Sequence, residues 1–399
     1  MPMEIIGHMQ SYEWGKLGKE SLVAQIMCKN SDFKINDQTP YAELWMGIHN
    51  NGESIVKDKE QPLSTWLKKY VNAEKSTIEQ LLPFLFKVLS VNKALSIQCH
   101  PNKQQAMDLF KKMPTIYKDG NHKPEMTIAV TEFQVMSGFR PVDEIKTFLK
   151  EIPEFEMLFP KGLISNYLNE HKEEYMKEIL KAWLAKKESE MEPIIKSFLN
   201  RLGNKDDDVK EKYHFSLIKQ LSEWYPNDVG VFMPFFLNYF ILKPGECMFI
   251  AAGVPHAYIK GDCVECMACS DNVVRCGLTP KLKDVNVLLE ILDFKSYTVD
   301  QLKMVGVPKG TGNVMVFNPP KQEFGLTRVT VQNGETYQSS VCKACSIFIV
   351  LSGVGEIGAG KGKKVLKFGS IFFLLPNETC SIKCTNEGPM VLYFAYGVK

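Results

Sequence analysis

The feature that most constrains the fold of this chain is a change of hydrophobic period between residues 151 and 224. In that segment apolar side chains recur every three or four positions with Lys and Glu between them, as on the buried face of an amphipathic helix. On both sides of the segment, short apolar runs alternate with turns, which is typical of strands. The sequence therefore predicts a mainly β chain with an inserted α-helical subdomain.

Three apolar stripes define the expected helices of the insertion. They cover residues 175–184, 194–202 and 217–224. Gly203 follows the second stripe at the C′ position, where a glycine commonly follows the end of a helix, and Pro226 follows the third. One further helix is expected near residues 284–292. The predicted division of the chain is a catalytic β domain over residues 1–150 and 227–310, a helical domain over 151–226, and a C-terminal β domain over 311–399.

A short internal sequence repeat links the two β regions. The stretch 241–249 parallels 365–373, and the same offset places Cys380 opposite His256. We therefore expect two related β units, of which the second has no metal site.

Composition excludes several classes of protein. The chain has 399 residues and a formal net charge of +2 without a basic block, so wholesale nucleic-acid binding is not expected. No apolar run is long enough to span a bilayer, and the first residues lack the apolar core of a signal peptide. Eleven scattered cysteines are typical of free thiols in a reducing compartment, which favours a cytoplasmic protein without a membrane partner.

A strand-like segment carries the first candidate metal ligands. Ser96, Gln98 and His100 stand two residues apart, so on a strand they share one face, while the apolar residues between them share the other. The strand-like runs 84–91 and 94–100 are separated only by two residues. This spacing predicts a hairpin with the candidate ligands on its second strand.

Two more ligands are expected downstream. Glu125 stands at the start of another strand-like run, and His256 follows a turn, a short apolar strand and a second turn. With Gln98 and His100 they supply two nitrogens and two oxygens, a set that suits zinc and similar divalent ions. Because only one ligand is charged, a zinc ion there would keep a net positive charge and remain a strong Lewis acid.

The pattern Cys263-x2-Cys266-x2-Cys269 invites comparison with a zinc ribbon or an iron–sulfur site. A ribbon requires two separated Cys-x2-Cys knuckles, and the chain has no second one. We therefore interpret these residues as buried thiols.

Longer motifs add a resemblance. The segment from Gly245 to His256 resembles the second metal motif of cupins, which are double-sheet jelly rolls, and Gln98-x-His100 stands where cupins usually carry His-x-His. Over nearly its whole length the chain resembles the type I phosphomannose isomerases. The resembling stretches are residues 10–15, 40–47, 82–103, 121–126, 236–239 and 255–281.

The resemblance implies a cupin-type jelly-roll catalytic domain, a second jelly-roll-like domain at the C-terminus, and a monomer with one Zn²⁺ per chain. It implies interconversion of mannose 6-phosphate and fructose 6-phosphate by proton transfer between C1 and C2 through a cis-enediolate. Such a reaction would serve GDP-mannose synthesis and mannose catabolism. The zinc ligands of the family fall on Gln98, His100, Glu125 and His256, and its active-site arginine falls on Arg275.

The reaction implied by the resemblance assigns roles to further residues. We favour Glu265 as the base, with a histidine or a metal-bound water left open as alternatives. Arg275 is expected to stabilise the charge of the enediolate. Lys123 is expected to orient a sugar hydroxyl, and Asp271 to assist ring opening or to orient a neighbouring ligand. The expected phosphate contacts are Lys281, Ser96 and Lys87.

Two other functions fit parts of the pattern. A different metal-dependent cupin enzyme, such as an iron-dependent oxygenase, usually binds its metal through two histidines and one carboxylate, whereas this chain adds Gln98. A non-catalytic sugar-binding β-barrel would need neither Glu265 nor Arg275. The residues therefore favour the isomerase.

Overall fold

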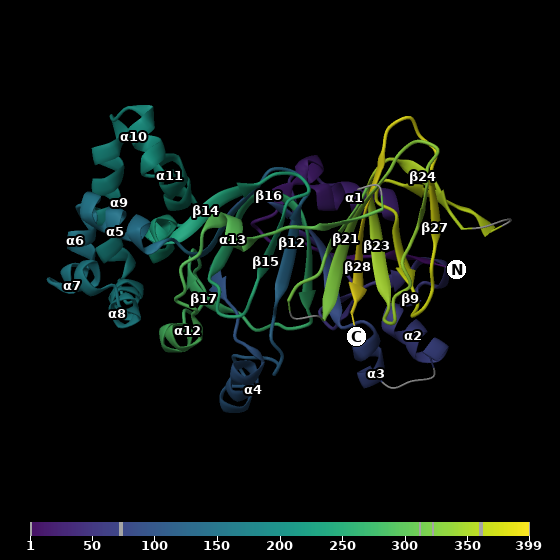
Figure 1. Ribbon diagram of the computed structural model, residues 1–399, viewed down its shortest axis with the longest axis horizontal. Helices are drawn as coiled ribbons and strands as arrows, with labels where there is room; N and C mark the ends of the chain where they lie inside the picture. The colour runs from purple at the N-terminus through teal and green to yellow at the C-terminus, as the bar shows by residue number, and fades with distance from the viewer. Residues whose placement is uncertain (1, 72–74, 311–312, 321–322, 359–361, 399) are drawn as a thin grey trace.

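The computed structural model describes residues 2–71, 75–310, 313–320, 323–358 and 362–398. These residues form an elongated molecule with the helices of residues 142–224 at one end and the C-terminal strands at the other (Figure 1). The predicted class, a mainly β chain with inserted helices, is confirmed, and the description of the two β units as jelly rolls stays a prediction. Within the described residues no helix combines the length and apolar character needed to cross a bilayer.

The inserted helices lie between strands β13 and β14. They are α5 (Val142–Glu151), α6 (Glu154–Leu158), α7 (Leu163–Glu170), α8 (Glu173–Leu184), α9 (Glu188–Gly203), α10 (Asp207–Lys212) and α11 (Phe215–Trp224). The three predicted stripes correspond to α8, α9 and α11, and their apolar faces share one core. Helix α9 includes Gly203, and Asn204 with φ −103° caps it, so the predicted C′ role of Gly203 is wrong. The helix expected near residues 284–292 is α12 (Val285–Ile291).

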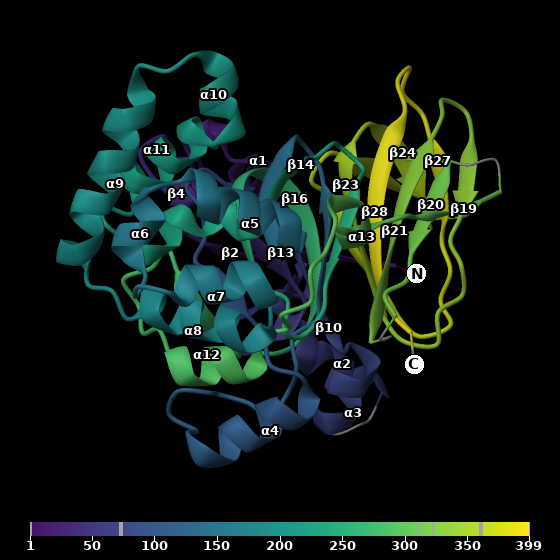
Figure 2. The same cartoon turned by 60° about the vertical axis from the view of Figure 1, so that its left-hand side comes forward.

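The largest sheet of the described residues occupies the middle of the molecule. Its main path runs β18 (Lys303–Met304), β15 (Cys247–Ile250), β12 (Glu125–Ala129), β16 (His256–Ala268), β10 (Phe84–Val91), β5 (Glu43–Met46) and β2 (His8–Gln10). Two more strands pair with β16, namely β11 (Ile97–Cys99) and β13 (Phe133–Phe139). Each carries one further strand, β17 (Val274–Gly277) beside β11 and β14 (Leu237–Leu242) beside β13. Figure 2 shows the inserted helices in front of one end of this sheet.

Two further sheets build the C-terminal end. The first runs β19 (Val307–Lys309), β20 (Val314–Phe317), β21 (Phe324–Val331), β28 (Met390–Gly397), β23 (Ser346–Ser352), β26 (Ile371–Leu374), β1 (Met3–Ile6), β8 (Ile55–Val56) and β9 (Gln61–Pro62). The second runs β22 (Thr336–Gln338), β27 (Ser381–Cys384), β24 (Val354–Ile357) and β25 (Lys364–Lys367). Because β1 pairs with β26, the start of the chain belongs to the C-terminal sheet, and the predicted domain bounds stay a prediction.

Smaller elements complete the described structure. The remaining helices are α1 (Leu22–Asn30), α2 (Leu63–Val71), α3 (Lys75–Leu81), α4 (Lys103–Lys112) and α13 (Val299–Leu302), and the 3-10 turns are η1 (Gly18–Glu20), η2 (Lys57–Lys59) and η3 (Val229–Phe235). Two short ladders pair β3 (Lys16–Leu17) with β4 (Pro40–Tyr41), and β6 (Ile48–His49) with β7 (Gly52–Glu53).

The predicted hairpin of β10 and β11 is wrong. β10 pairs with β5 and β16, whereas β11 pairs with β16 and β17. The backbone N–H groups of Asn92 and Lys93 donate to the carbonyl of Trp14 at 2.9 and 3.1 Å, which directs the chain away from a tight turn. The pair Asn92-Lys93 also lacks the glycine that favours a two-residue hairpin. Both strands instead line up along β16, which is 13 residues long.

A change of backbone direction within β16 allows this strand to pair with two different sets of strands. Its first residues pair with β11 and β13, and its later residues pair with β10 and β12. Gly261 marks the change with a φ of 120°, and a side chain there would collide with the carbonyl of Glu132. The lack of a side chain therefore lets one strand reach both halves of the sheet.

Strand alternation separates apolar from charged side chains in the central sheet. Phe86, Met126 and Val264 lie on the face that packs against the C-terminal sheet. On β10, β12 and β16 the opposite face carries buried polar side chains instead, including Lys87 and Glu265. This second face forms the wall of the site described below.

The two segments of the predicted internal repeat both contain a turn with a glycine at positive φ. The turn between β14 and β15 contains Gly245 with φ 89°, and the turn between β25 and β26 contains Gly369 with φ 83°. In the described structure β14 does not pair with β15, and β25 does not pair with β26. Each turn therefore connects strands that belong to different ladders. Cys380 is buried in the apolar core between the two C-terminal sheets.

Candidate metal centre and its cavity

Three of the four predicted metal ligands meet in the interior. Nε2 of His100 lies 3.4 Å from Oε1 of Glu125, and Nε2 of His256 lies 3.3 Å from Oε2 of the same carboxylate. One ligand atom from each of the three residues lies within 4.8 Å of the others. All three side chains are buried, and Gln98 is half-buried. Among the described residues no other group of three His, Cys, Asp or Glu side chains is this close.

Sheet pairing brings these distant residues together. On β11, Gln98 stands opposite His256 of β16 on one side and opposite Arg275 of β17 on the other. Glu125 opens β12 and stands beside the later part of β16. His100 directly follows β11, and its carbonyl accepts a hydrogen bond of 2.9 Å from the N–H of Gly253. The site is therefore built where four strand ends converge.

Backbone carbonyls orient both imidazoles. Nδ1 of His100 lies 2.8 Å from the carbonyl oxygen of Asn272, and Nδ1 of His256 lies 3.0 Å from that of Val254. Because a carbonyl can only accept, each Nδ1 carries the proton and each neutral ring presents an Nε2 lone pair to the centre. Burial lowers the pKa of His100 to about 4, which keeps that ring neutral near pH 7.

The cluster lacks the donors that it needs. Nε2 of His100, Nε2 of His256 and Oε2 of Glu125 are buried and have no hydrogen-bond partner in the described part of the chain. Leaving such acceptors unsatisfied costs about 1–3 kcal/mol each. A divalent cation would satisfy all three at once, and nitrogen and oxygen donors of this kind suit zinc. The residues therefore fit the predicted metal.

A cavity of about 760 Å³ opens beside the cluster. Seven predicted site residues line it, namely Lys87, Ser96, Gln98, Lys123, Asp271, Arg275 and Lys281. The predicted base Glu265 is buried behind this lining and contacts Lys87. The structure therefore brings every predicted site residue to one cavity or to its wall, while their individual roles stay predictions.

Lys87 lies between two carboxylates. Its Nζ is 3.2 Å from Oε2 of Glu43 and 3.2 Å from Oε2 of Glu265. Burial alone would lower the pKa of Lys87, but the two carboxylates raise it above its ordinary value. Burial raises the pKa of Glu265, and Lys87 opposes this shift. Sequence reasoning missed Glu43, because only the pairing of β5 with β10 brings its carboxylate beside Lys87.

Lys123 and Asp271 also have charged neighbours. Nζ of Lys123 lies 3.3 Å from Oε1 of Glu125. Burial alone would raise the pKa of Glu125, but Lys123 and His100 hold it well below its ordinary value. The half-exposed Asp271 carboxylate lies 3.3 Å from Nε2 of His49, and that hydrogen bond lowers the pKa of Asp271. The wall of the cavity thus holds fixed charges of both signs.

Comparison with known proteins agrees with this site. The family model described as phosphomannose isomerase type I, catalytic domain, matches residues 3–142, and the model for the helical insertion domain of the same family matches residues 160–237. The chain is 39% identical to mannose-6-phosphate isomerase from Rattus norvegicus and 37% identical to that from Homo sapiens, and each match covers 97% of this chain and 96% of the relative. This chain belongs to the type I phosphomannose isomerase family. The predicted family is confirmed, and the chain is an isomerase.

Solved structures of this family match the whole chain. A crystal structure of mannose 6-phosphate isomerase bound with zinc and yttrium matches with a TM-score of 0.84 and 28% identity, and covers 100% of both chains. A mutant of phosphomannose isomerase from Salmonella typhimurium matches with a TM-score of 0.85 and the same identity and coverage. The fold of this family therefore extends over the entire chain.

A loop behind His100 is held by a residue that sequence reasoning missed. The carboxylate of Asp119 accepts hydrogen bonds from the Ser270 hydroxyl at 2.9 Å, from the N–H of Asp271 at 2.8 Å and from the side-chain amide of Asn272 at 3.2 Å. Asn272 in turn offers its carbonyl to His100. Asp119 lies in an irregular segment before Glu125, where no periodic pattern marks it in the sequence.

The cysteine pattern of this isomerase is a set of free thiols, as predicted. Cys263 and Cys266 are buried and Cys269 is half-buried, and all eleven cysteines are free. Burial raises the pKa of the Cys269 thiol to about 12 and raises those of Cys263 and Cys266 well above the ordinary value. Among the described residues the three sulfurs do not meet in one cluster of possible ligand atoms, and each thiol packs in or against a different apolar cluster, so these residues serve as core side chains.

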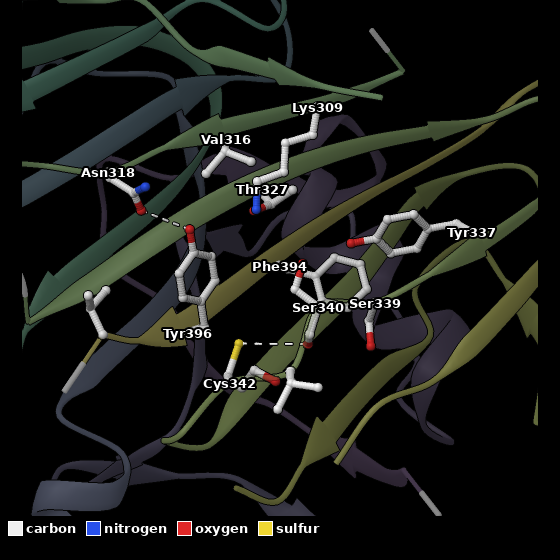
Figure 3. Close-up of a pocket in the computed structure, with 13 residues that line it drawn as sticks. Lys309, Val316, Asn318, Thr327, Tyr337, Ser339, Ser340, Cys342, Phe394 and Tyr396 are labelled. Carbon is white, nitrogen blue, oxygen red and sulfur yellow. Dashed lines mark hydrogen bonds between the residues drawn. The ribbon is translucent and has the colours of Figure 1, made fainter. Parts of the chain in front are cut away.

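A second cavity of about 390 Å³ lies in the C-terminal unit (Figure 3). Aromatic and hydroxyl side chains dominate its lining, including Tyr337, Phe394 and Thr327, and the Tyr396 hydroxyl donates to Oδ1 of Asn318 at 2.9 Å. Among the described residues that line it there is no histidine or carboxylate, and Lys309 is the one charged side chain. This cavity therefore lacks the acid–base groups found beside the metal cluster.

Proposed function

We propose that this chain is a zinc-dependent mannose-6-phosphate isomerase that interconverts mannose 6-phosphate and fructose 6-phosphate. The observation that carries the proposal is the buried cluster of His100, Glu125 and His256, whose facing acceptors have no donors. The names of the relatives support the substrate, and the solved neighbour bound with zinc supports the metal.

Gln98, His100, Glu125 and His256 would hold the ion. When bound, zinc would supply a Lewis acid that stabilises negative charge developing on the sugar oxygens. The protein's own contribution is to present neutral imidazole lone pairs, through the two backbone carbonyls at Nδ1, and to exclude water around Glu125.

Glu265 is the proposed base that moves the proton between C1 and C2 through a cis-enediolate. Its burial raises its pKa, which brings the carboxylate closer to the working pH that favours proton transfer. The ammonium of Lys87 holds Glu265 in place at 3.2 Å. Arg275, which stands opposite Gln98 in the sheet, is proposed to donate hydrogen bonds to the enediolate oxygens.

The remaining roles follow from position along the cavity. Lys123 beside Glu125 is proposed to orient a sugar hydroxyl. Asp271 at the cavity wall, with its pKa lowered by the hydrogen bond with His49, is proposed to assist ring opening as an ionised carboxylate. We further propose a cytoplasmic monomer with one zinc ion, two jelly-roll units, and a role in GDP-mannose synthesis and mannose catabolism.

A coupled assay tests the proposed function. Purified protein loaded with zinc should convert mannose 6-phosphate into fructose 6-phosphate, chelation should abolish turnover, and added zinc should restore it. Turnover that requires iron and consumes oxygen would instead identify the alternative cupin enzyme. Zinc-loaded protein that binds the sugar without turnover would overturn the isomerase in favour of a sugar-binding β-barrel.

A further inference from the structure

The cations that line the cavity differ in whether they already have a carboxylate partner. Lys87 and Lys123 each lie within 3.3 Å of buried carboxylates. Lys93, Arg275 and Lys281 line the same cavity but make no ion pair with any residue in the described parts of the chain. A cation without an acidic partner keeps its charge available for a ligand, so these three favour an anion more strongly than Lys87 does.

The unpaired cations lie on neighbouring segments of the cavity lining. Lys93 and Ser96 belong to the segment that leads into β11, where Gln98 stands opposite Arg275. Lys281 lies shortly after β17, the strand that carries Arg275, and it lines the same cavity as Ser96. Hydroxyl and cationic donors together are what a phosphate group needs, because its oxygens only accept at neutral pH.

The residues that follow the last helix of the insertion contact Lys93 and its neighbour. Tyr225 directly follows α11, and its hydroxyl donates to the carbonyl of Ala94 at 2.5 Å. Nζ of Lys93 lies 4.4 Å from the centre of the Tyr225 ring, which is a cation–π contact. The ring thus steadies the ammonium without neutralising it.

The same end of the insertion also holds the loop that carries Lys281. Oδ1 of Asp228 accepts from the N–H of Leu278 at 2.6 Å, and Oδ2 accepts from the N–H of Thr279 at 3.4 Å. The Thr279 hydroxyl accepts in turn from the N–H of Lys281 at 3.1 Å. Tyr225 and Asp228, three residues apart, therefore position two cationic segments that are far apart in the sequence.

We propose that Lys93 contacts the substrate phosphate together with Ser96 and Lys281, and that Tyr225 and Asp228 are positioning residues that join the helical insertion to this phosphate subsite. Arg275, between this subsite and the metal cluster, keeps its proposed role at the enediolate oxygens. The inference rests on the proposed function for its substrate. Lys87 then lies outside the subsite and serves Glu265, because two carboxylates already surround its ammonium.

Substitution at residue 93 tests the subsite by separating KM from kcat. Lys93→Met should raise KM for mannose 6-phosphate and the inhibition constant of inorganic phosphate by roughly fivefold to tenfold, as expected for one partly exposed charged contact. The kcat should stay within about twofold, since the reacting carbons are held elsewhere. Lys93→Arg should regain most of the affinity. Lys112→Met, which removes an exposed charge at the end of α4, is the matched control and should change neither constant.

Two further variants sharpen the assignment. Tyr225→Phe keeps the ring beside Lys93 and should stay close to wild type in phosphate inhibition, whereas Tyr225→Leu should weaken it about as much as Lys93→Met. Lys87→Met should lower kcat and leave phosphate inhibition unchanged.

The inference is overturned if Lys93→Met matches Lys112→Met in both constants, or if Lys87→Met rather than Lys93→Met weakens phosphate inhibition. Failure of the proposed function is a different result, namely wild-type protein without isomerase turnover. In that case titration calorimetry with inorganic phosphate still compares wild type with Lys93→Met, and equal affinities would overturn the subsite alone.

Discussion

The central sheet and the C-terminal sheet use the same strand alternation for different purposes. In β10, β12 and β16 one face is apolar, and the other presents Lys87, Glu125 and Glu265 in buried positions. In β23 and β28 both faces are apolar, as Phe348 and Ile349 on adjacent positions illustrate. Buried ionised groups are costly unless they are paired, so a chain retains them where chemistry requires them.

This contrast extends to the two cavities. The cavity beside the metal cluster has cations and carboxylates in its wall, whereas the C-terminal cavity in Figure 3 is lined mainly by aromatic and hydroxyl side chains. The turns at Gly245 and Gly369 have similar backbone conformations, yet His256 follows the first and Cys380 follows the second. We infer that similar strand–turn–strand segments form a reaction site in one unit and a scaffold in the other.

The largest effect is expected at the proposed base. Glu265→Gln keeps the size of the side chain but cannot accept the proton, so kcat should fall by roughly 10²- to 10⁴-fold. Zinc content, measured by plasma mass spectrometry, should stay at the wild-type level because Glu265 is not a ligand. A kcat within tenfold of wild type would assign the proton transfer to another group and remove the functional reason for this buried carboxylate.

A somewhat smaller loss is expected at the cationic side of the same cavity. Arg275→Ala should lower kcat by about 10²- to 10³-fold, the usual effect of losing one donor to a developing oxyanion. The metal should remain bound, and Arg275→Lys should recover only part of the rate because a lysine cannot donate two parallel hydrogen bonds. Steady-state kinetics with zinc analysis check this, and unchanged kcat in Arg275→Ala would refute the assigned role.

Weaker metal binding is expected when the loop behind His100 loses its anchor. Asp119→Asn should lower zinc affinity by roughly 10- to 100-fold, since the loop that presents the Asn272 carbonyl to Nδ1 of His100 would be less well held. Competition with a fluorescent chelator measures the affinity. Asp32→Asn, at an exposed position, is the matched control. Equal affinities in the two variants would show that the loop does not tune the site.

The smallest effect on catalysis is expected in the C-terminal unit. Phe348 stacks on Phe372 at 5.4 Å and lies 4.7 Å from Phe394 between ring centres. Phe348→Ala should lower the free energy of unfolding by about 3–5 kcal/mol through the cavity that it leaves. The kcat per folded molecule should stay unchanged, as urea unfolding and active-site titration together will show. A loss of kcat in the fully folded variant would contradict the claim that the C-terminal unit acts only as a scaffold.

Local patterns in the sequence predicted much of this arrangement. The helical stripes predicted α8, α9 and α11 because the burial of one helix face depends on residues close in sequence. Strand alternation predicted that Ser96, Gln98 and His100 share one face, and the structure brings His100 together with Glu125 and His256 as their chemistry required. Such periodic patterns can be read from the sequence because the period of a strand or a helix depends only on residues close together in the chain.

Long-range pairing set the limits of prediction. The supposed hairpin after Val91 failed because β16 is long enough to pair with both β10 and β11, which no local feature of residues 84–100 reveals. Asp119 and Glu43 were missed for a related reason. Each acts through partners that only the tertiary structure brings close, such as Ser270 and Lys87.

Zinc content tests the central claim most directly. Plasma mass spectrometry on protein purified without chelators should find about one zinc per chain in the wild type, and almost none when His100→Ala is combined with His256→Ala. The control Cys380→Ala, at the corresponding place in the C-terminal unit, should retain the wild-type content. Equal zinc in wild type and the double variant, or full isomerase turnover in metal-free protein, would contradict the account.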